Sequence, residues 1–276
     1  MNDAQAFSDR LRIWTFMLCL GASAVAGGCA SGSGASGAAG GRPDLVTESD
    51  EPEARKRARI RLELAVGYFE QGQTTVALDE LKQSIIADPG FAEAYNLRGL
   101  IYMRLNDQGL ADQSFRRALT LNPNDGNTLH NYGWLLCQQA RYPEAVQYFS
   151  QALANPLYRE RAKTWMAQGL CQVRAGQRVD GENSLLRSYE LDAGNPIAGY
   201  NLSLLLYQRG EFVRAQFYVR RLNNSELANS ESLWLGIKVE RRMENREAMQ
   251  QLSVQLKKRF PQSKEAAALD RGAFDE

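Results

Sequence analysis

The chain has 276 residues, with 33 Lys and Arg against 32 Asp and Glu, so its formal net charge is +1. This balance argues against nucleic-acid binding, which needs an excess of basic residues to follow the phosphates. There is one histidine, His130, and the sequence lacks Gly-rich phosphate loops, nucleophile-elbow motifs and zinc-protease motifs. We therefore expect a globular, non-enzymatic protein with no cofactor, no metal and no small-molecule substrate.

Residues 1–28 have the features of an export signal. Two arginines precede an uncharged apolar run over residues 13–25, which ends in small residues. A helix that crosses the hydrocarbon core needs about 20 residues, so this run fits the apolar region of a secretory signal better than a permanent membrane span. The sequence predicts export.

The apolar run stops at Ala26-Gly27-Gly28-Cys29, which resembles the cleavage box of bacterial lipoproteins, with Ala26 where that motif usually has Leu. The resemblance implies that Cys29 is lipidated, for example with palmitate. It also implies that the protein is anchored to the outer membrane and faces the periplasm. Residues 29–52, rich in Ser, Gly and Ala at their start, would be the flexible linker behind the lipid. Ordinary secretion with an unmodified cysteine is the alternative.

The rest of the chain repeats with a period near 34 residues. The repeats start at Ala58, Ala92, Gly126, Ala162, Pro196 and Asn229. The eighth and twentieth residues of every repeat are small, and the twenty-fourth is a large apolar residue, for example Gly99, Ala111 and Phe115 in the second repeat. Small residues let two antiparallel helices approach closely, and the large residue fills the space beside them. Each unit is therefore predicted to be a helical hairpin, with Gly72, Asn106, Gly176 and Gly210 closing first helices.

This pattern resembles the tetratricopeptide repeat, and it covers residues 58–262. The resemblance implies an all-α fold in which six hairpins, over residues 53–263, stack into a right-handed superhelix with the first helices lining its concave face. Residues 264–276 are expected to be a terminal helix or a frayed tail.

The inward-facing positions of the first helices are the candidate binding site. At the ninth and twelfth positions of the six repeats, eleven of twelve residues are apolar or aromatic, and Glu240 is the exception. Such a stripe suggests a groove that accepts apolar side chains of a partner protein. The candidate contact residues in the first three repeats are Leu62, Val66, Phe69, Asn96, Leu100, Met103 and Trp134, with Asn96 available to bind peptide backbone. The alternative is that the ninth-position residues only pack against the neighbouring repeat.

Three further features favour structural roles. His130 has no nucleophile and carboxylate placed beside it by spacing, so a catalytic role is not expected. The basic cluster Arg55, Lys56, Arg57, Arg59 and Arg61 is interpreted as a solvated face, with anionic lipid or an acidic partner as the alternative. Cys137 and Cys171 occupy different positions of adjacent repeats, which favours two buried thiols over a disulfide.

Several local sequences point to a narrower resemblance. They are His130-Asn131-Tyr132-Gly133-Trp134, the link Leu157-Tyr158-Arg159-Glu160-Arg161, and Gln255-Leu256-Lys257-Lys258-Arg259-Phe260-Pro261. Together with the cleavage box and the six repeats, they resemble the type IV pilus biogenesis and stability lipoproteins, the pilotins of the pilus secretin.

This resemblance implies a partner and a role. The partner would be the secretin subunit, and the role would be to bring it to the outer membrane and promote its assembly into the multimer, in support of pilus biogenesis and twitching motility. The alternative is a tetratricopeptide scaffold lipoprotein that serves outer-membrane protein assembly or cell-wall hydrolases. Such a protein would share the repeats and the tether but not the Leu157-Tyr158 link.

Overall fold

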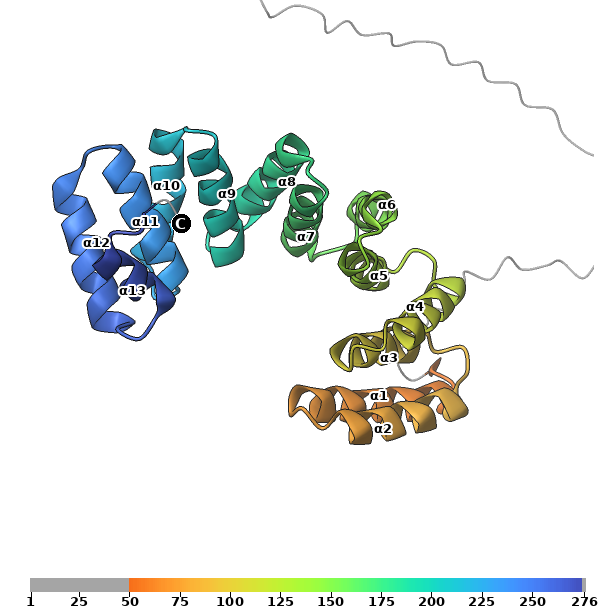
Figure 1. The fold of residues 1–276 in the computed structure, drawn as a ribbon. Coiled ribbons are helices and arrows are strands. Elements are labelled where there is room, and N and C mark those ends of the chain that lie inside the picture. The colour runs from red at the N-terminus through yellow and green to blue at the C-terminus, as the bar shows by residue number, and fades with distance from the viewer. Residues whose placement is uncertain (1–49, 275–276) are drawn as a thin grey trace, which may run out of the picture. The chain divides into compact units, whose positions relative to one another are not determined.

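The structure is a computed structural model that describes residues 50–274, and this part of the chain contains thirteen helices and no strand (Figure 1). In chain order the helices are α1 (Glu53–Glu70), α2 (Thr74–Ala87), α3 (Ala92–Arg104), α4 (Gln108–Leu121), α5 (Gly126–Gln138), α6 (Tyr142–Ala154), α7 (Arg161–Arg174), α8 (Arg178–Leu191), α9 (Pro196–Gln208), α10 (Phe212–Asn223), α11 (Ser230–Arg242), α12 (Arg246–Arg259) and α13 (Lys264–Arg271). The expected signal segment and Cys29 lie outside the described residues. Within residues 50–274, no helix is both long and apolar enough to cross a membrane.

Helices α1 to α12 form six antiparallel hairpins, each closed by a tight turn. The four residues predicted to end first helices all have left-handed backbone, with φ of 78° at Gly72, 59° at Asn106, 81° at Gly176 and 85° at Gly210. Glycine and asparagine adopt this conformation at low cost, which is why they end helices. Ala140 and Glu244 adopt it at the equivalent turns of the third and sixth hairpins, although their sequence gives no such signal.

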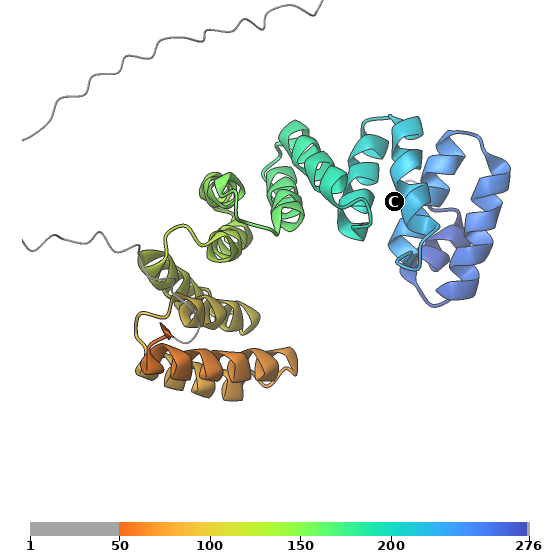
Figure 2. The ribbon, with the colours of Figure 1, turned by 180° about the vertical axis from the view of Figure 1, so that it is seen from behind.

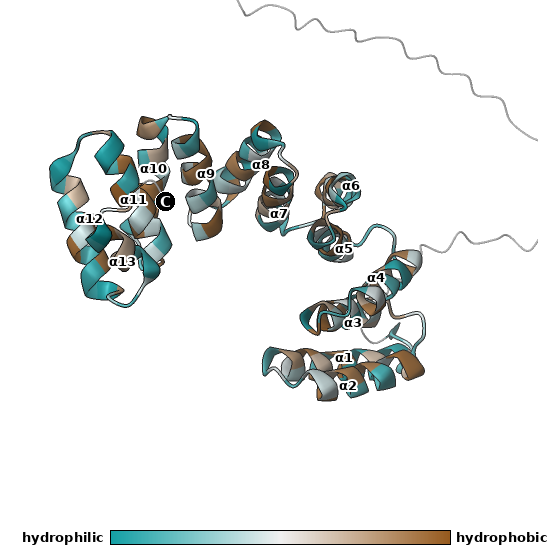
Figure 3. Ribbon diagram, viewed as in Figure 1, coloured by the Kyte–Doolittle hydropathy of each residue, from teal (hydrophilic) through white to brown (hydrophobic). Residues whose placement is uncertain are grey.

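The small residues within each hairpin make the predicted close contacts. A Cβ atom added to Gly99 would lie 2.6 Å from the ring of Phe115, and one added to Gly133 would lie 2.9 Å from the ring of Phe149. Both rings are fully buried. Most helices combine apolar and polar residues, so their ribbons carry both brown and teal in Figure 3. The predicted hairpin packing is confirmed.

Each hairpin packs against the next in chain order, as the two opposite views show (Figures 1 and 2). The contacts run between consecutive first helices, such as α3 with α5 and α5 with α7, and between each second helix and the first helix that follows it. The buried residues form successive clusters along the stack. The all-α repeat architecture predicted from the sequence is therefore present.

Helix α13 packs on the last hairpin. It contacts both α11 and α12. Its residue Ala266 is buried in one cluster with Leu233, Trp234 and Ile237 of α11. The Phe274 ring, beyond the end of α13, stacks on Trp234 at a centroid distance of 5.2 Å. The chain thus covers its own last hairpin with a terminal helix.

Candidate functional site

The first helices of the hairpins carry the predicted contact residues on one surface, called here the first-helix face. Leu62, Val66 and Phe69 come from α1, Asn96, Leu100 and Met103 from α3, and Trp134 from α5. None of the seven is buried. Val66 is the most accessible, with 37% of its surface exposed, and the others are half-buried.

These residues also take part in packing between hairpins. Leu100 contacts the clusters of both the first and the third hairpins, so it bridges neighbouring repeats. Leu62 and Phe69 pack partly against the first cluster, and Met103 and Trp134 against the next. Val66 belongs to none of these clusters. Among the ninth-position residues, Leu100 packs between repeats and also lies partly at the surface, whereas Val66 packs against none of the clusters. Both interpretations of the ninth position therefore apply in part.

Polar groups frame this apolar surface. The guanidinium of Arg104 lies 5.3 Å from the ring of Phe69, and that of Arg174 lies 5.1 Å from the ring of Trp134. The side-chain oxygen of Asn96 accepts a hydrogen bond from Asn131 at 3.1 Å. The arrangement suits an extended or helical peptide, whose apolar side chains need accessible carbon surface and whose backbone needs oriented polar groups.

The predicted apolar stripe does not continue through all six repeats, so that expectation is corrected for the sixth. Leu233 and Ile237, at its fifth and ninth positions, are fully buried, because α13 packs over them. A pocket of about 330 Å³ lies beside α13, between α9, α11 and α13. Its lining residues include Tyr200, Leu204 and Trp234. The accessible first-helix face therefore ends at the fifth repeat.

The favoured prediction of two free thiols is wrong, because Cys137 of α5 and Cys171 of α7 form a disulfide with a Cα–Cα distance of 5.7 Å. Both cysteines are buried. They are the twelfth and tenth residues of their repeats. These two positions face each other across the hairpin interface, so a difference in repeat position does not separate the two side chains. The bond ties the third hairpin to the fourth.

His130 is buried inside the stack, where it contacts Thr164 of the fourth hairpin. Its Nδ1 atom is 2.8 Å from the hydroxyl of Thr164, which is also 2.8 Å from the hydroxyl of Tyr158. Burial lowers the pKa of His130 to about 4, with a further contribution from the positive charge of Lys163. The imidazole is therefore neutral near pH 7 and links the third hairpin to the fourth.

The Leu157-Tyr158 link has a structural role of its own. The Tyr158 ring covers Gly126, where an added Cβ would lie 2.4 Å from the ring. Tyr158 is buried together with Leu129 and Ala152. Its burial raises the pKa of its phenol. The link therefore fills the space left between the third and fourth hairpins by their longer spacing in the sequence.

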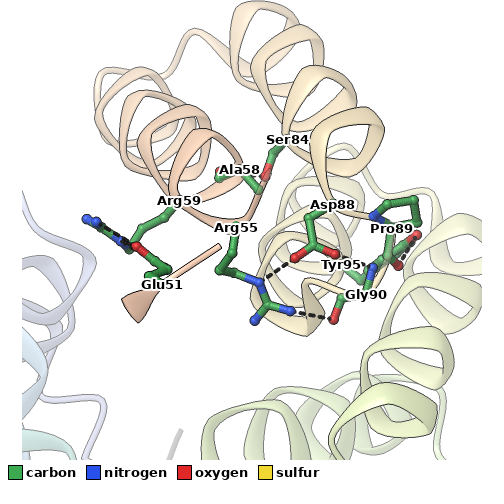
Figure 4. Close-up of polar contacts among 9 residues, drawn as sticks. All are labelled: Glu51, Arg55, Ala58, Arg59, Ser84, Asp88, Pro89, Gly90 and Tyr95. Atoms are coloured by element: carbon green, nitrogen blue, oxygen red, sulfur yellow. Dashed lines mark hydrogen bonds and ion pairs between the residues drawn. The ribbon is translucent and has the colours of Figure 1, made fainter. Parts of the chain in front are cut away.

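The basic cluster of α1 is only partly solvated. Figure 4 shows Arg55 directed at Asp88 and at the carbonyl of Gly90, which it reaches at 3.4 Å, and Arg59 paired with Glu51 at 3.1 Å. The pairing with Arg55 lowers the pKa of Asp88. Arg61 pairs with Glu80 of α2 at 2.8 Å. Three of the five cations therefore fasten α1 to its surroundings.

Comparison with known proteins fits this geometry. The tetratricopeptide repeat pattern matches residues 92–125 and again residues 114–147. The chain therefore contains tetratricopeptide repeats. It is also homologous to two type IV pilus proteins over most of its length.

The homologues are PilF and PilW. The chain is 29% identical over 221 residues to the type IV pilus assembly protein PilF of Pseudomonas aeruginosa, covering 80% of this chain and 86% of PilF. The solved structure of P. aeruginosa PilF superposes with a TM-score of 0.73 at 27% identity, over 80% of this chain and all of that one. PilW, described as a widely conserved type IV pilus biogenesis factor, gives 0.70 at 28% identity, over 77% of this chain and 97% of its own.

Proposed function

We propose that this protein acts in type IV pilus biogenesis as a non-enzymatic assembly factor that binds the pilus secretin subunit. The observation that carries the proposal is the homology to PilF and PilW, which extends over about four-fifths of this chain and nearly all of theirs. A shared fold alone would not suggest a role, since tetratricopeptide stacks serve many partners. The similarity in sequence over 221 residues is what favours the pilus.

The accessible part of the first-helix face supplies the binding surface. Val66, Leu100 and Trp134 offer apolar area to a partner, and each fully buried partner side chain would contribute about 1.5–3 kcal/mol. Association itself costs about 4–15 kcal/mol, so several side chains of one continuous segment must be buried together. The protein would cover an apolar segment of the unassembled subunit and release it when subunits contact each other. No bond is made or broken in this role.

The second part of the proposal concerns location. The cleavage box at Cys29 supports a lipid anchor, and Ala30 after it favours the outer membrane under the sorting rule known from enteric bacteria. Two or more acyl chains would hold the protein at the membrane almost permanently, because each buried methylene contributes about 0.8 kcal/mol. The disulfide agrees with export, since such bonds persist in oxidising compartments.

Deletion of the gene tests the proposed partner. Immunoblots of the secretin should then show loss of the heat- and detergent-resistant multimer, with the subunit still present. An unchanged multimer would reject the secretin and favour a scaffold for other outer-membrane or cell-wall proteins. For the anchor, Cys29→Ala should abolish acyl labelling and shift the protein out of the outer-membrane fraction, and a labelled variant would contradict it.

A further inference from the structure

The twenty-second residue of each repeat lies on the second helix and is exposed in all six repeats. It points away from the first helices, because it lies about 200° around the helix from the twentieth and twenty-fourth residues, which pack against them. Five of the six residues are polar, as a solvated position requires: Asp79, Gln113, Gln147, Asn183 and Gln250. The exception is Phe217 of α10, which is 61% exposed, and Val213, one turn before it, is 71% exposed. The fifth hairpin therefore carries an apolar surface that its own packing does not use.

A second departure from the repeat pattern lies in the same hairpin. The fourth residue of the fifth repeat is Gly199, whereas the three repeats before it have large side chains there: Tyr95, Leu129 and Trp165. A pocket of about 70 Å³ lies beside Gly199, and Tyr189 and Arg221 are among its lining residues. In the second repeat, Arg117 lies 5.6 Å from the ring of Tyr95, and these two positions are equivalent to Arg221 and Gly199. The pocket thus lies where other repeats place a large side chain.

Two hydrogen-bond donors without an acceptor border this pocket. Tyr189 is 8% exposed, and its hydroxyl has no hydrogen-bond partner among the described residues. Arg221 is exposed, makes no ion pair or hydrogen bond within residues 50–274, and lies 5.9 Å from the ring of Tyr189. Burial raises the pKa of the Tyr189 phenol, and the charge of Arg221 opposes this shift, so the two groups are close. Since buried polar groups are nearly always paired, these donors point to a ligand that accepts hydrogen bonds and is negatively charged.

The pocket and the apolar surface are continuous. Val213, Phe217 and Arg221 follow one another at intervals of four residues, so they lie along one side of α10. The ring of Tyr218 joins the two features, because it lies 5.1 Å from the ring of Phe217 and 4.9 Å from that of Tyr189. One helical turn, about 6 Å along the axis, separates Phe217 from Arg221. A single short segment of another protein can therefore reach both.

We propose that this surface, called here the fifth-hairpin site, binds a short segment of a partner protein that carries an acidic residue next to an apolar one. The apolar side chain packs on Val213 and Phe217, and the carboxylate enters the pocket, where it accepts hydrogen bonds from the Tyr189 hydroxyl and the Arg221 guanidinium. The small pocket suits a group of the size of a carboxylate. Because the site faces away from the first helices, it can be occupied together with the first-helix face. The inference goes beyond the proposed function and does not depend on it.

The test begins with photo-cross-linking of the full-length protein in intact cells. Phe217→p-benzoylphenylalanine keeps an aromatic ring at the site and should yield a cross-linked partner protein on irradiation. The matched control is Gln250→p-benzoylphenylalanine, at the same position of the sixth repeat, which should yield none. Mass spectrometry should place the cross-link in a segment with Asp or Glu within about four residues, the span of one helical turn. Arg221→Glu should reduce the yield, whereas Arg187→Glu, at the equivalent position of α8, should not.

A synthetic peptide of the mapped segment then measures the contribution of each donor by fluorescence anisotropy. Arg221→Glu should raise the dissociation constant about tenfold or more at low salt and by less at high salt. A peptide with Lys in place of its acidic residue should bind Arg221→Glu better than it binds the wild type. Tyr189→Phe should raise the dissociation constant about threefold to tenfold at either salt concentration, because it removes one donor. It should not lower the melting temperature, because the hydroxyl has no partner in the free protein.

Several results would overturn the proposal. They are the absence of a product at Phe217, a product that contains a second copy of this chain, a mapped segment without an acidic residue, and a yield that Arg221→Glu leaves unchanged. Vesicles of anionic phosphatidylglycerol test the lipid alternative with Cys29→Ala protein, which carries no acyl chain. Vesicle binding that Arg221→Glu abolishes, without any protein cross-link, would assign the site to lipid. Failure of the wild type to bind purified secretin subunit would reject the proposed function and leave this inference standing.

Discussion

Arg220 of α10 holds the carboxylate of Glu240 of α11 in a two-point contact, with Nε at 2.7 Å from one oxygen and Nη2 at 3.1 Å from the other. Gln216 adds a third hydrogen bond at 2.9 Å. The two partners differ in burial, because the Glu240 side chain is 1% exposed and that of Arg220 is 45% exposed. This pair connects the fifth hairpin to the sixth.

The difference in burial predicts unequal effects of removing each partner. Arg220→Met leaves a buried carboxylate without its cation, and we expect a loss of about 3–5 kcal/mol in the free energy of unfolding. Glu240→Met leaves a cation that water can reach, and we expect a loss of about 1–2 kcal/mol. Urea denaturation of both variants measures this, and a larger loss for Glu240→Met would contradict the assignment of burial.

The disulfide predicts sensitivity to reductants. The bond closes a loop across a sequence separation of 34 residues, so its loss should lower the free energy of unfolding by about 2–4 kcal/mol. Urea denaturation with and without dithiothreitol gives the difference. The double variant Cys137→Ala/Cys171→Ala serves as the control and should respond to the reductant hardly at all. Equal stability of the wild type in both conditions would mean that the two thiols are free in solution.

His130 predicts a specific pH dependence. Its pKa falls from an ordinary value of 6.5 to about 4 in the folded protein, so between these values the unfolded chain binds more protons. The stabilisation is complete above pH 6.5 and is lost as the pH falls towards 4. Between pH 7 and pH 5 the wild type should lose on the order of 1–2 kcal/mol more than His130→Gln, because the carboxylates titrate alike in both proteins. If the free energy of unfolding changed with pH in the same way for the wild type and for His130→Gln, His130 would not be desolvated in the folded protein.

Two glycines within helices predict opposite effects of the same substitution. Gly99→Ala forces a Cβ against the buried Phe115 ring and should cost about 1–3 kcal/mol despite the better helix propensity of alanine. Gly67→Ala meets open space and should stabilise the protein by up to about 1 kcal/mol. Thermal unfolding of the two variants checks this pair, and a stable Gly99→Ala protein would contradict the close packing of α3 on α4.

The first-helix face predicts a separation of binding from stability. Val66→Asp should weaken secretin binding while changing the free energy of unfolding by less than about 0.5 kcal/mol, because Val66 is exposed and outside the packed clusters. Leu100→Asp should weaken binding and also cost about 1–2 kcal/mol or more, since Leu100 bridges two clusters. Normal binding by Val66→Asp would show that the Val66 side chain is not part of the binding surface.

The hairpins could be predicted from the sequence because their determinants are local. Gly99 and Phe115 meet within one unit, and the same spacing recurs in the next units, so the period alone identifies the contact. The turns at Ala140 and Glu244 could not be found in this way, because neither residue favours left-handed backbone. Packing of the flanking helices imposes that conformation on them.

Contacts between units were harder to predict. Cys137 and Cys171 differ in repeat position, and only the way α5 lies against α7 shows that the twelfth position of one repeat faces the tenth of the next. The cover of Leu233 and Ile237 depends on where α13 packs after the last hairpin, and no periodic signal encodes this. The first-helix face could be predicted as a pattern of apolar residues. How far each of these residues also packs between neighbouring repeats could not be predicted.

In a stack held only by contacts between neighbours, unfolding can begin at either end and stop at any boundary. The covalent bond between Cys137 and Cys171 removes one of these stopping points, since the third and fourth hairpins cannot separate while it is intact. Amide protons of α5 and α7 should therefore exchange with solvent as one cooperative group. Within residues 50–274, the first hairpin contacts only the second, so it can fray separately from the rest of the stack.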